Sequence, residues 1–174
     1  MLMEFIRKRR SIRKFKNKPV PEEVLTLLKE AILRAPTSRG INPWSFIIVD
    51  NAEILQKLAL SKPHGASFLK QTPLAIVIVA DTSKSDVWVE DTSIVATYLQ
   101  LVAEEQGLGS CWIQIRNRMH NDTLSARDYI ANLLNIPSGF DVENIIALGF
   151  ADETKPPHSQ DTLQFEKIFH NRMN

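Results

Sequence analysis

The sequence predicts one domain in which strands and helices alternate and pack in layers, of the α+β or α/β class. Two observations carry this prediction. Four short apolar segments with strand character are separated by stretches in which apolar residues recur at helical spacing. The length of 174 residues suits one domain with a sizeable core, and no internal repeat divides it. We therefore expect residues 1–174 to form a single domain.

The first third of the chain begins with a short helix over 3–10 and a turn over 17–23. Pro21 suits the first helical position, and the acidic pair after it suits the positive end of a helix dipole. Apolar residues then recur at helical spacing until Pro36 ends the helix. After a polar loop, the run WSFIIV over 44–49 is typical of a buried strand.

The middle third opens with a helix that either Asp50 or Asn51 could cap. A loop over 61–67 follows this helix. After Pro73, the run LAIVIVA over 74–80 is typical of a central strand that is buried on both faces.

The last third contains a long amphipathic helix over 89–106, with Gly107 as its C-cap. A short strand is predicted over 110–115. A capping box over 125–128 opens another helix, and the run NIIALGF over 144–150 is the last strand of the core.

The segment over 151–174 is polar at first and contains prolines. It is too long for a loose end, and it carries Phe165, Ile168 and Phe169, which need apolar neighbours. We expect this C-terminal extension to pack on a partner subunit.

The composition is that of a soluble globular protein, with 44% hydrophobic and 24% charged residues. The single cysteine, Cys111, excludes an internal disulfide. The longest apolar run, over 74–80, is far shorter than a membrane span, and the N-terminus lacks the features of a secretory signal. These observations predict a cytoplasmic protein without a membrane partner.

Positive charge is concentrated in the stretch RKRRSIRKFKNK over 7–18, where eight of twelve residues are Lys or Arg. The whole chain has 21 basic and 20 acidic residues, so the remainder has 13 against 20, a net charge of −7. An anionic partner is therefore expected here: nucleic acid, a lipid surface or a small phosphorylated molecule. Nucleic acid is disfavoured because only Phe15 offers a stacking platform in this stretch.

Within this stretch, RRSIR has the chemistry of a phosphate site. Guanidinium groups bind oxyanions through paired hydrogen bonds, and a serine hydroxyl adds one more donor. The alternative is a solvated basic face.

Two further stretches have functional interpretations. The loop APTSRGINPW can read the edge of a planar heterocycle with backbone groups and polar side chains, or it is a plain connection. In GLGSCWIQ, two glycines allow close backbone approach, or they form a helix cap and a tight turn. Cys111 fits core packing better than a nucleophile. The chain has no dinucleotide fingerprint, no nucleophile elbow and no metal-ligand spacing, and the four histidines are expected at the surface.

RRSIRKF, APTSRGINPWSFIIV and GLGSCWIQ followed by IIALGF, in this order, resemble the nitroreductase family of FMN-dependent oxidoreductases across nearly the whole chain. The resemblance implies an α+β three-layer sandwich with a mainly antiparallel central sheet flanked by helices. It also implies an intertwined homodimer with two FMN sites at the subunit interface, each lined by both chains.

The resemblance also implies roles for individual residues. Arg9 and Ser11 would hold the FMN phosphate with Arg10 beside it, and Arg13 would face the pyrimidine end of the flavin. The loop residues would reach the flavin from the partner chain, and the backbone after Cys111 would lie along the isoalloxazine. The expected cofactor-binding residues are Arg9, Arg10, Ser11, Arg13, Pro36, Thr37, Ser38, Asn42, Trp112, Ile113 and Gln114.

No side chain is expected to act as a catalytic acid or base, because the flavin would carry hydride from NADH or NADPH to a small acceptor, with ping-pong kinetics. One departure from the family concerns the C-terminal basic pair, whose places here correspond to His158 and Gln160. Lys155 or Arg172 could compensate. The chain also lacks long lid insertions, which predicts an open pocket.

Three alternatives stay open at this stage. The chain could be a non-catalytic FMN carrier or sensor, its basic stretch could bind nucleic acid after all, or it could resemble the family's dehalogenating and flavin-cleaving members. The physiological acceptor and the preference between NADH and NADPH are not encoded in a recognisable motif.

Overall fold

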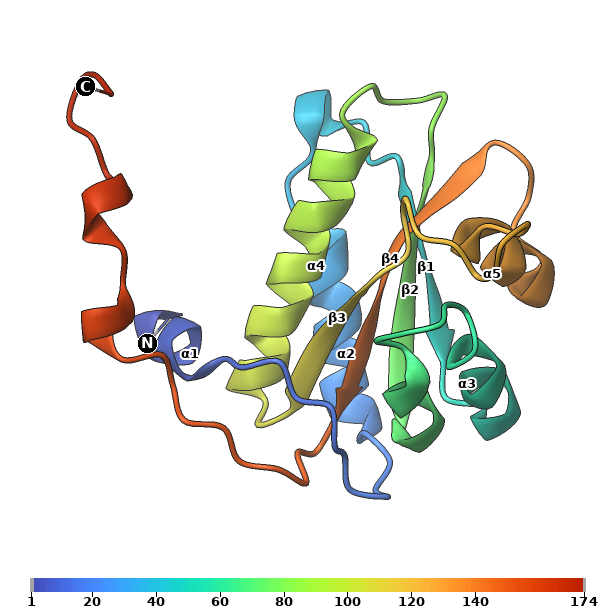
Figure 1. The fold of residues 1–174 in the computed structure, drawn as a ribbon, viewed down its shortest axis with the longest axis horizontal. Helices are drawn as coiled ribbons and strands as arrows, with labels where there is room; N and C mark the ends of the chain where they lie inside the picture. Colours follow the sequence, from blue (N-terminus) through green and yellow to red (C-terminus); the bar gives the residue numbers. More distant parts are fainter. Residues whose placement is uncertain (1, 174) are drawn as a thin grey trace.

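A computed structural model describes residues 2–173 and contains a four-stranded sheet at its centre (Figure 1). The strand order is β1-β2-β4-β3, and every neighbouring pair is antiparallel. The strands are β1 (Trp44–Val49), β2 (Leu74–Asp81), β3 (Gly109–Gln114) and β4 (Phe140–Gly149). The antiparallel α+β interpretation is confirmed, and the parallel α/β alternative is wrong.

The two central strands explain why their sequences are so apolar. All of β2 except its last residue is buried, and so are the last eight residues of β4. A strand covered on both faces needs apolar side chains on both, rather than an alternating pattern. The β2–β4 pairing shifts its register between Ile78 and Val79, which marks a β-bulge.

Helices cover both faces of the sheet. The helices α2 (Glu22–Leu33) and α4 (Trp88–Glu105) lie on one face, and α3 (Ala52–Leu58) and α5 (Ala126–Leu134) lie on the other (Figure 1). Each face has its own apolar core, one with Leu28, Ile76 and Leu99, the other with Leu58, Val77 and Ile145. The short helix α1 (Leu2–Lys8) lies beside α4.

The long helix α4 carries two different faces. Val95, Leu99 and Ala103 are fully buried against the sheet, as their helical spacing predicts. Ile94 and Tyr98, on another side of the helix, are about two-fifths exposed. This second, apolar side is open in the single chain.

The caps agree with the sequence. The Asn51 side chain accepts a hydrogen bond from the Ile54 N–H (3.0 Å), and Ser125 accepts one from the Asp128 N–H (2.9 Å). Gly107 follows α4 with φ of +72°, a left-handed conformation that glycine adopts without steric cost. Of the two residues that could cap α3, Asn51 therefore does so.

Two elements differ from the prediction. The strand expected over 144–150 begins at Phe140, because residues 140–143 continue the ladder with β2 beyond the bulge. A 3₁₀ helix, η2 (Ser67–Gln71), occupies part of a segment without a predicted element, and it buries Leu69 against the core.

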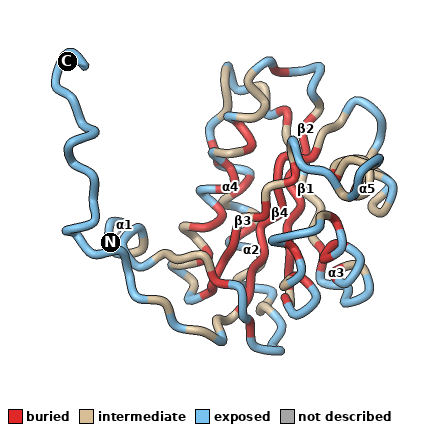
Figure 2. The backbone as a smooth tube through the Cα atoms, viewed as in Figure 1, coloured by how far each residue is buried: buried red, intermediate tan, exposed pale blue. Residues whose placement is uncertain are grey.

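The chain beyond β4 leaves the body of the domain. It contains two short 3₁₀ helices, η3 (Gln160–Thr162) and η4 (Phe165–Lys167), and extends away from the sheet (Figures 1 and 2). The described residues from 156 onward are exposed (Figure 2). Separately, no helix within residues 2–173 is both long and apolar enough to cross a membrane.

Candidate functional site

The basic N-terminal stretch lies along the outer edge of β3. The Ile12 N–H donates to the Ser110 carbonyl (2.9 Å), and Ser11 and Ser110 form a parallel bridge. Ile12 is buried in the core, which anchors the stretch. The sequence predicts only a ligand-binding role for this stretch, whereas its backbone also covers part of a sheet edge.

Gly109 allows this close approach. A Cβ atom at this position would lie 2.9 Å from three side-chain carbons of Ile12, closer than real Cβ contacts. The predicted close approach is therefore confirmed at Gly109, where the partner is the basic stretch, whereas Gly107 follows the alternative of a helix cap.

The chain after β4 holds the other side of the basic stretch. The Glu153 Oε1 atom accepts hydrogen bonds from the backbone N–H groups of Arg13 (2.5 Å) and Lys14 (3.2 Å). The pKa of Glu153 is lowered, chiefly by the bond from the Arg13 N–H. Phe15 and Ala151 form an antiparallel bridge nearby. These bonds fix the backbone from which the basic side chains project.

Lys155 joins this cluster. Its Nζ atom donates to the Ser11 carbonyl (2.6 Å) and lies 3.3 Å from Glu153 Oε1. Arg10 donates to the Pro156 carbonyl, so the segment after β4 contacts the basic stretch through both Arg10 and Lys155. His158, Gln160 and Arg172 belong to the exposed extension instead. We call residues 9–13 with Lys155 the basic cradle.

Next to the basic cradle, β3 presents its own backbone. In an antiparallel ladder, the N–H and C=O groups of alternate residues point to the same edge. Ser110 O and Gln114 O point away from β4, because they accept bonds from Ile12 and from Lys62 Nζ (2.9 Å). By the same alternation, the backbone N–H and C=O groups of Trp112 and the backbone N–H group of Gln114 face this outer edge.

Ile113 differs from its neighbours. Its side chain is 1% exposed within the core, and its backbone pairs with Ile145 of β4. Of the three β3 residues expected to line a cofactor, the structure therefore offers the backbone of Trp112 and Gln114 at the edge, while Ile113 packs inward.

Lys62 is a candidate site residue that the sequence did not reveal. It stands in the loop after α3, and its ammonium group lies against Gln114 on the outer edge of β3. Partial burial lowers its pKa, and the nearby Arg118 adds to this effect. No motif marks this lysine, because its partner is 52 residues away in the sequence.

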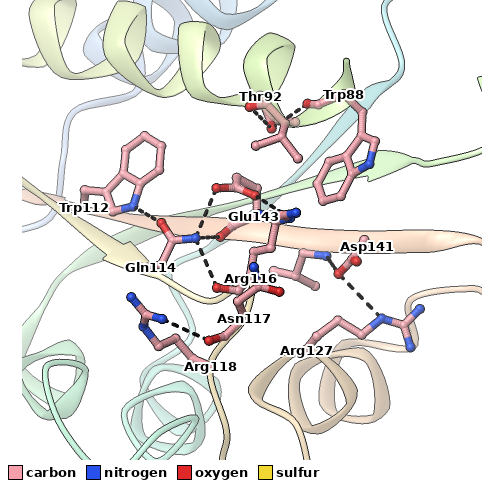
Figure 3. A network of polar contacts seen from close by, with 12 residues as sticks. Trp88, Thr92, Trp112, Gln114, Arg116, Asn117, Arg118, Arg127, Asp141 and Glu143 are labelled. Carbon is pink, nitrogen blue, oxygen red and sulfur yellow. Dashed lines mark hydrogen bonds and ion pairs between the residues drawn. The ribbon is translucent and has the colours of Figure 1, made fainter. Parts of the chain in front are cut away.

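Side chains under the N-terminal half of α4 form a polar network (Figure 3). Trp112 Nε1–H donates to Gln114 Oε1 (2.9 Å), and Gln114 Nε2–H donates to Glu143 Oε1 (3.1 Å). The Arg116 guanidinium lies 4.0 Å from Glu143 and 5.7 Å from the centroid of the Trp88 ring. Burial raises the pKa of Glu143.

The loop with Pro36, Thr37, Ser38 and Asn42 lies elsewhere. Thr37 Oγ1 and the Asn42 side chain are 2.8 Å apart, and the Ser38 N–H donates to Asp91 at the start of α4 (2.8 Å). The 18 residues of α4 span about 27 Å, and the basic cradle lies by its other end (Figure 1). One chain does not bring this loop to the cradle.

Other chemistries find little support. Burial raises the pKa of the Cys111 thiol, which disfavours the thiolate that a nucleophile needs. Residues 2–173 contain no group of three or more His, Cys, Asp or Glu side chains that could hold a metal ion.

The fold and the site together define an antiparallel α+β domain with a cluster of basic residues beside an edge strand. A family model described as the nitroreductase family matches residues 6–62 and 60–150. The chain therefore belongs to the nitroreductase family.

Individual relatives agree with this assignment. A solved structure of an FMN-dependent nitroreductase from Clostridium difficile R20291 is 48% identical, with a TM-score of 0.97 over 98% of this chain and 99% of that one. A solved NADH dehydrogenase/NAD(P)H nitroreductase from Parabacteroides distasonis is 32% identical, with a TM-score of 0.89 over 99% and 98%. A curated protein of the same description from Methanothermobacter thermautotrophicus is 32% identical over 96% of this chain and 85% of its own.

Replacing Gly109 tests how the cradle is held. In Gly109→Ala, the added methyl group overlaps Ile12 and pushes the basic stretch away from β3. A strain of about 1–3 kcal/mol predicts amide exchange at Ile12 that is about ten- to a hundredfold faster. Hydrogen–deuterium exchange measures this rate, with exposed Ser45→Ala on β1 as the control. Unchanged exchange at Ile12 would contradict the close-contact argument.

Proposed function

We propose that this protein is an FMN-dependent oxidoreductase that takes hydride from NADH or NADPH and passes it to nitroaromatics, quinones or similar small acceptors. The observation that carries the proposal is the outer edge of β3, where backbone donors and acceptors alternate directly beside the basic cradle. A flavin has the matching parts: a ring edge that alternates acceptors with a donor, and a phosphate at the end of a flexible chain.

The residues present fit such a cofactor. Arg9 and Ser11 would bind the phosphate, with Arg10 beside it, and Lys155 would replace the missing C-terminal basic pair. The contact of Lys155 with Ser11 supports this substitution over Arg172. Arg13 would place a cation near the pyrimidine end. Trp112 and Gln114 would offer their backbone groups to the ring.

Bound FMN would supply the redox chemistry by accepting a hydride at N5 and releasing it to a second substrate. The protein binds the phosphate, orients the ring against β3 and places cations where negative charge collects. No side chain has to act as an acid or base in this scheme. One open pocket would serve donor and acceptor in turn, which predicts ping-pong kinetics.

We also propose a homodimer in which each site draws on both chains. The loop over 36–42 lies at the far end of α4 from the cradle of its own chain, so only a second copy can bring it there (Figure 1). Apolar side chains are exposed on α1, on α4 and along the extension, including Leu2, Ile6, Tyr98, Phe165 and Ile168. Such exposure suits a surface covered by a partner.

The first test is an absorbance spectrum. The purified protein should show flavin bands and bleach when NADH or NADPH is added under nitrogen, because hydride transfer reduces the ring. Flavin bands that persist after both nucleotides would instead favour a carrier or sensor. A protein that takes up no added FMN would refute the proposal.

Arg9→Ala tests the phosphate assignment. Loss of a charge-assisted contact worth about 1.5–3 kcal/mol should weaken FMN binding about ten- to a hundredfold. Fluorescence titration of the apoprotein with FMN measures the dissociation constant. Arg7→Ala removes the same charge from exposed α1 outside the motif and should leave the constant nearly unchanged. Full FMN occupancy of Arg9→Ala after gel filtration would show that the assignment is wrong.

The double variant Phe165→Ala with Ile168→Ala tests the role of the extension. If these exposed side chains are buried in the dimer, the dimer dissociation constant should rise about a hundredfold or more, because the two substitutions together lose about 3–6 kcal/mol of burial. Analytical ultracentrifugation over a dilution series measures this, with Glu166→Ala as the control. A wild-type protein that is monomeric at every concentration would contradict the homodimer.

A further inference from the structure

We propose that Glu143, acting through Gln114, takes up a proton when the bound flavin is reduced and releases it on oxidation, so that this buried carboxyl sets the pH dependence of the reduction potential. The inference rests on the proposed function, because it requires a flavin at the outer edge of β3. Glu143 needs no contact with the flavin and acts on it through Gln114, so we call Glu143 a positioning residue.

Glu143 is a buried carboxyl with few partners. Its side chain is 4% exposed. Oε1 accepts one hydrogen bond, from Gln114 Nε2, and Oε2 makes none within residues 2–173. A buried carboxylate normally needs several donors or a close cation, so the surroundings of Glu143 disfavour its charged form.

The charges around Glu143 have opposing effects on the ionisation of its carboxyl group. Arg116 favours the carboxylate, but its Nε atom is 4.0 Å away and its side chain is 39% exposed, so water screens it. Asp141 on β4 and Glu90 on α4 both oppose the carboxylate. From the β3 side, only the neutral amide of Gln114 donates to it. Burial is the largest effect, and it raises the pKa of Glu143.

Gln114 connects this carboxyl to the proposed flavin site (Figure 3). Its Oε1 atom accepts from Trp112 Nε1–H, so its amide NH₂ must face Glu143. Its backbone carbonyl accepts from Lys62 on the outer edge of β3. One residue therefore contacts both the buried carboxyl and the edge where the ring would lie.

Electrostatics gives the direction of the effect. Uptake of two electrons and one proton leaves a net negative charge on a flavin, and a nearby like charge disfavours the Glu143 carboxylate. Reduction then raises the pKa of Glu143, and a proton from solvent neutralises it. By reciprocity, an ionised Glu143 makes reduction harder. The reduction potential should therefore fall more steeply with pH while Glu143 titrates.

The experiment compares FMN-loaded wild type with Glu143→Gln, which keeps the shape and removes the charge. Spectroelectrochemical titration gives the midpoint potential between about pH 5 and pH 9. At high pH, Glu143→Gln should have the higher potential, with a reduced-to-oxidised ratio about tenfold greater, or about 30 mV for a two-electron couple. At low pH the two proteins should coincide, because wild-type Glu143 is then neutral.

Glu53→Gln is the matched control, since it removes an exposed carboxylate from α3 and should follow wild type throughout. A difference between Glu143→Gln and wild type that is constant with pH would indicate a structural effect and overturn the inference. Equal midpoint potentials of Glu143→Gln and wild type at every pH would overturn the inference as well.

A second measurement uses the wild type alone and covers the case in which Glu143→Gln does not fold. A reduced-minus-oxidised infrared spectrum should contain a new carboxylic-acid C=O band that shifts in D₂O. Its absence in an FMN-loaded protein would overturn the role of Glu143 and leave the proposed function intact. A wild type that binds no FMN would overturn both.

Discussion

The position of β3 at the edge of the sheet is the constraint on which the site depends. An edge strand leaves a row of backbone donors and acceptors that must find partners other than a neighbouring strand. In this chain the Ile12 N–H donates to the Ser110 carbonyl of this row, and Lys62 Nζ donates to the Gln114 carbonyl. Between them lie the backbone groups of Trp112 and Gln114, which are the groups that the proposed cofactor would meet. The same edge therefore fixes where the basic stretch lies and where we propose that a planar ring binds.

The length of α4 imposes a second constraint. It separates the loop over 36–42 from the basic cradle, although the family resemblance implies that both serve one site. Asp91 fixes the loop at the start of the helix by accepting from Ser38, and Gly107 and Gly109 place the cradle at its end. A site that uses both parts has to be assembled from two copies of the chain.

Much of the fold could be predicted from local sequence. The strand β1 has the predicted bounds, and the caps at Asn51 and Ser125 are where the pattern placed them. The start of β4 was missed because residues 140–143 lack the apolar run that signals a strand. Local signals also single out the RRSIR and GLGSCW stretches, but they do not predict that the two stretches contact each other.

The parts of the site that escaped prediction depend on distant pairings. Lys62 and Gln114 are 52 residues apart, and Gln114 and Glu143 are 29 apart. Ile113 was predicted to line the cofactor together with Trp112 and Gln114; its backbone pairs with Ile145 and its side chain is buried, and its predicted role stays a prediction. Lys155 and Arg172 could both compensate for the missing pair as far as the sequence goes, and the bond of Lys155 to the Ser11 carbonyl, 144 residues away, could not be predicted from it.

The bonds between the two ends of the chain also have a consequence for folding. Glu153 binds the backbone at Arg13 across 140 residues, and Lys155 reaches Ser11 across 144. Contacts of such long range form late, because the entropy of closing a large loop has to be overcome first. On the ribosome, the cradle can close only after Glu153 and Lys155 have emerged. Until then the basic stretch lacks these partners, so the proposed flavin could stabilise the protein only after that point in synthesis.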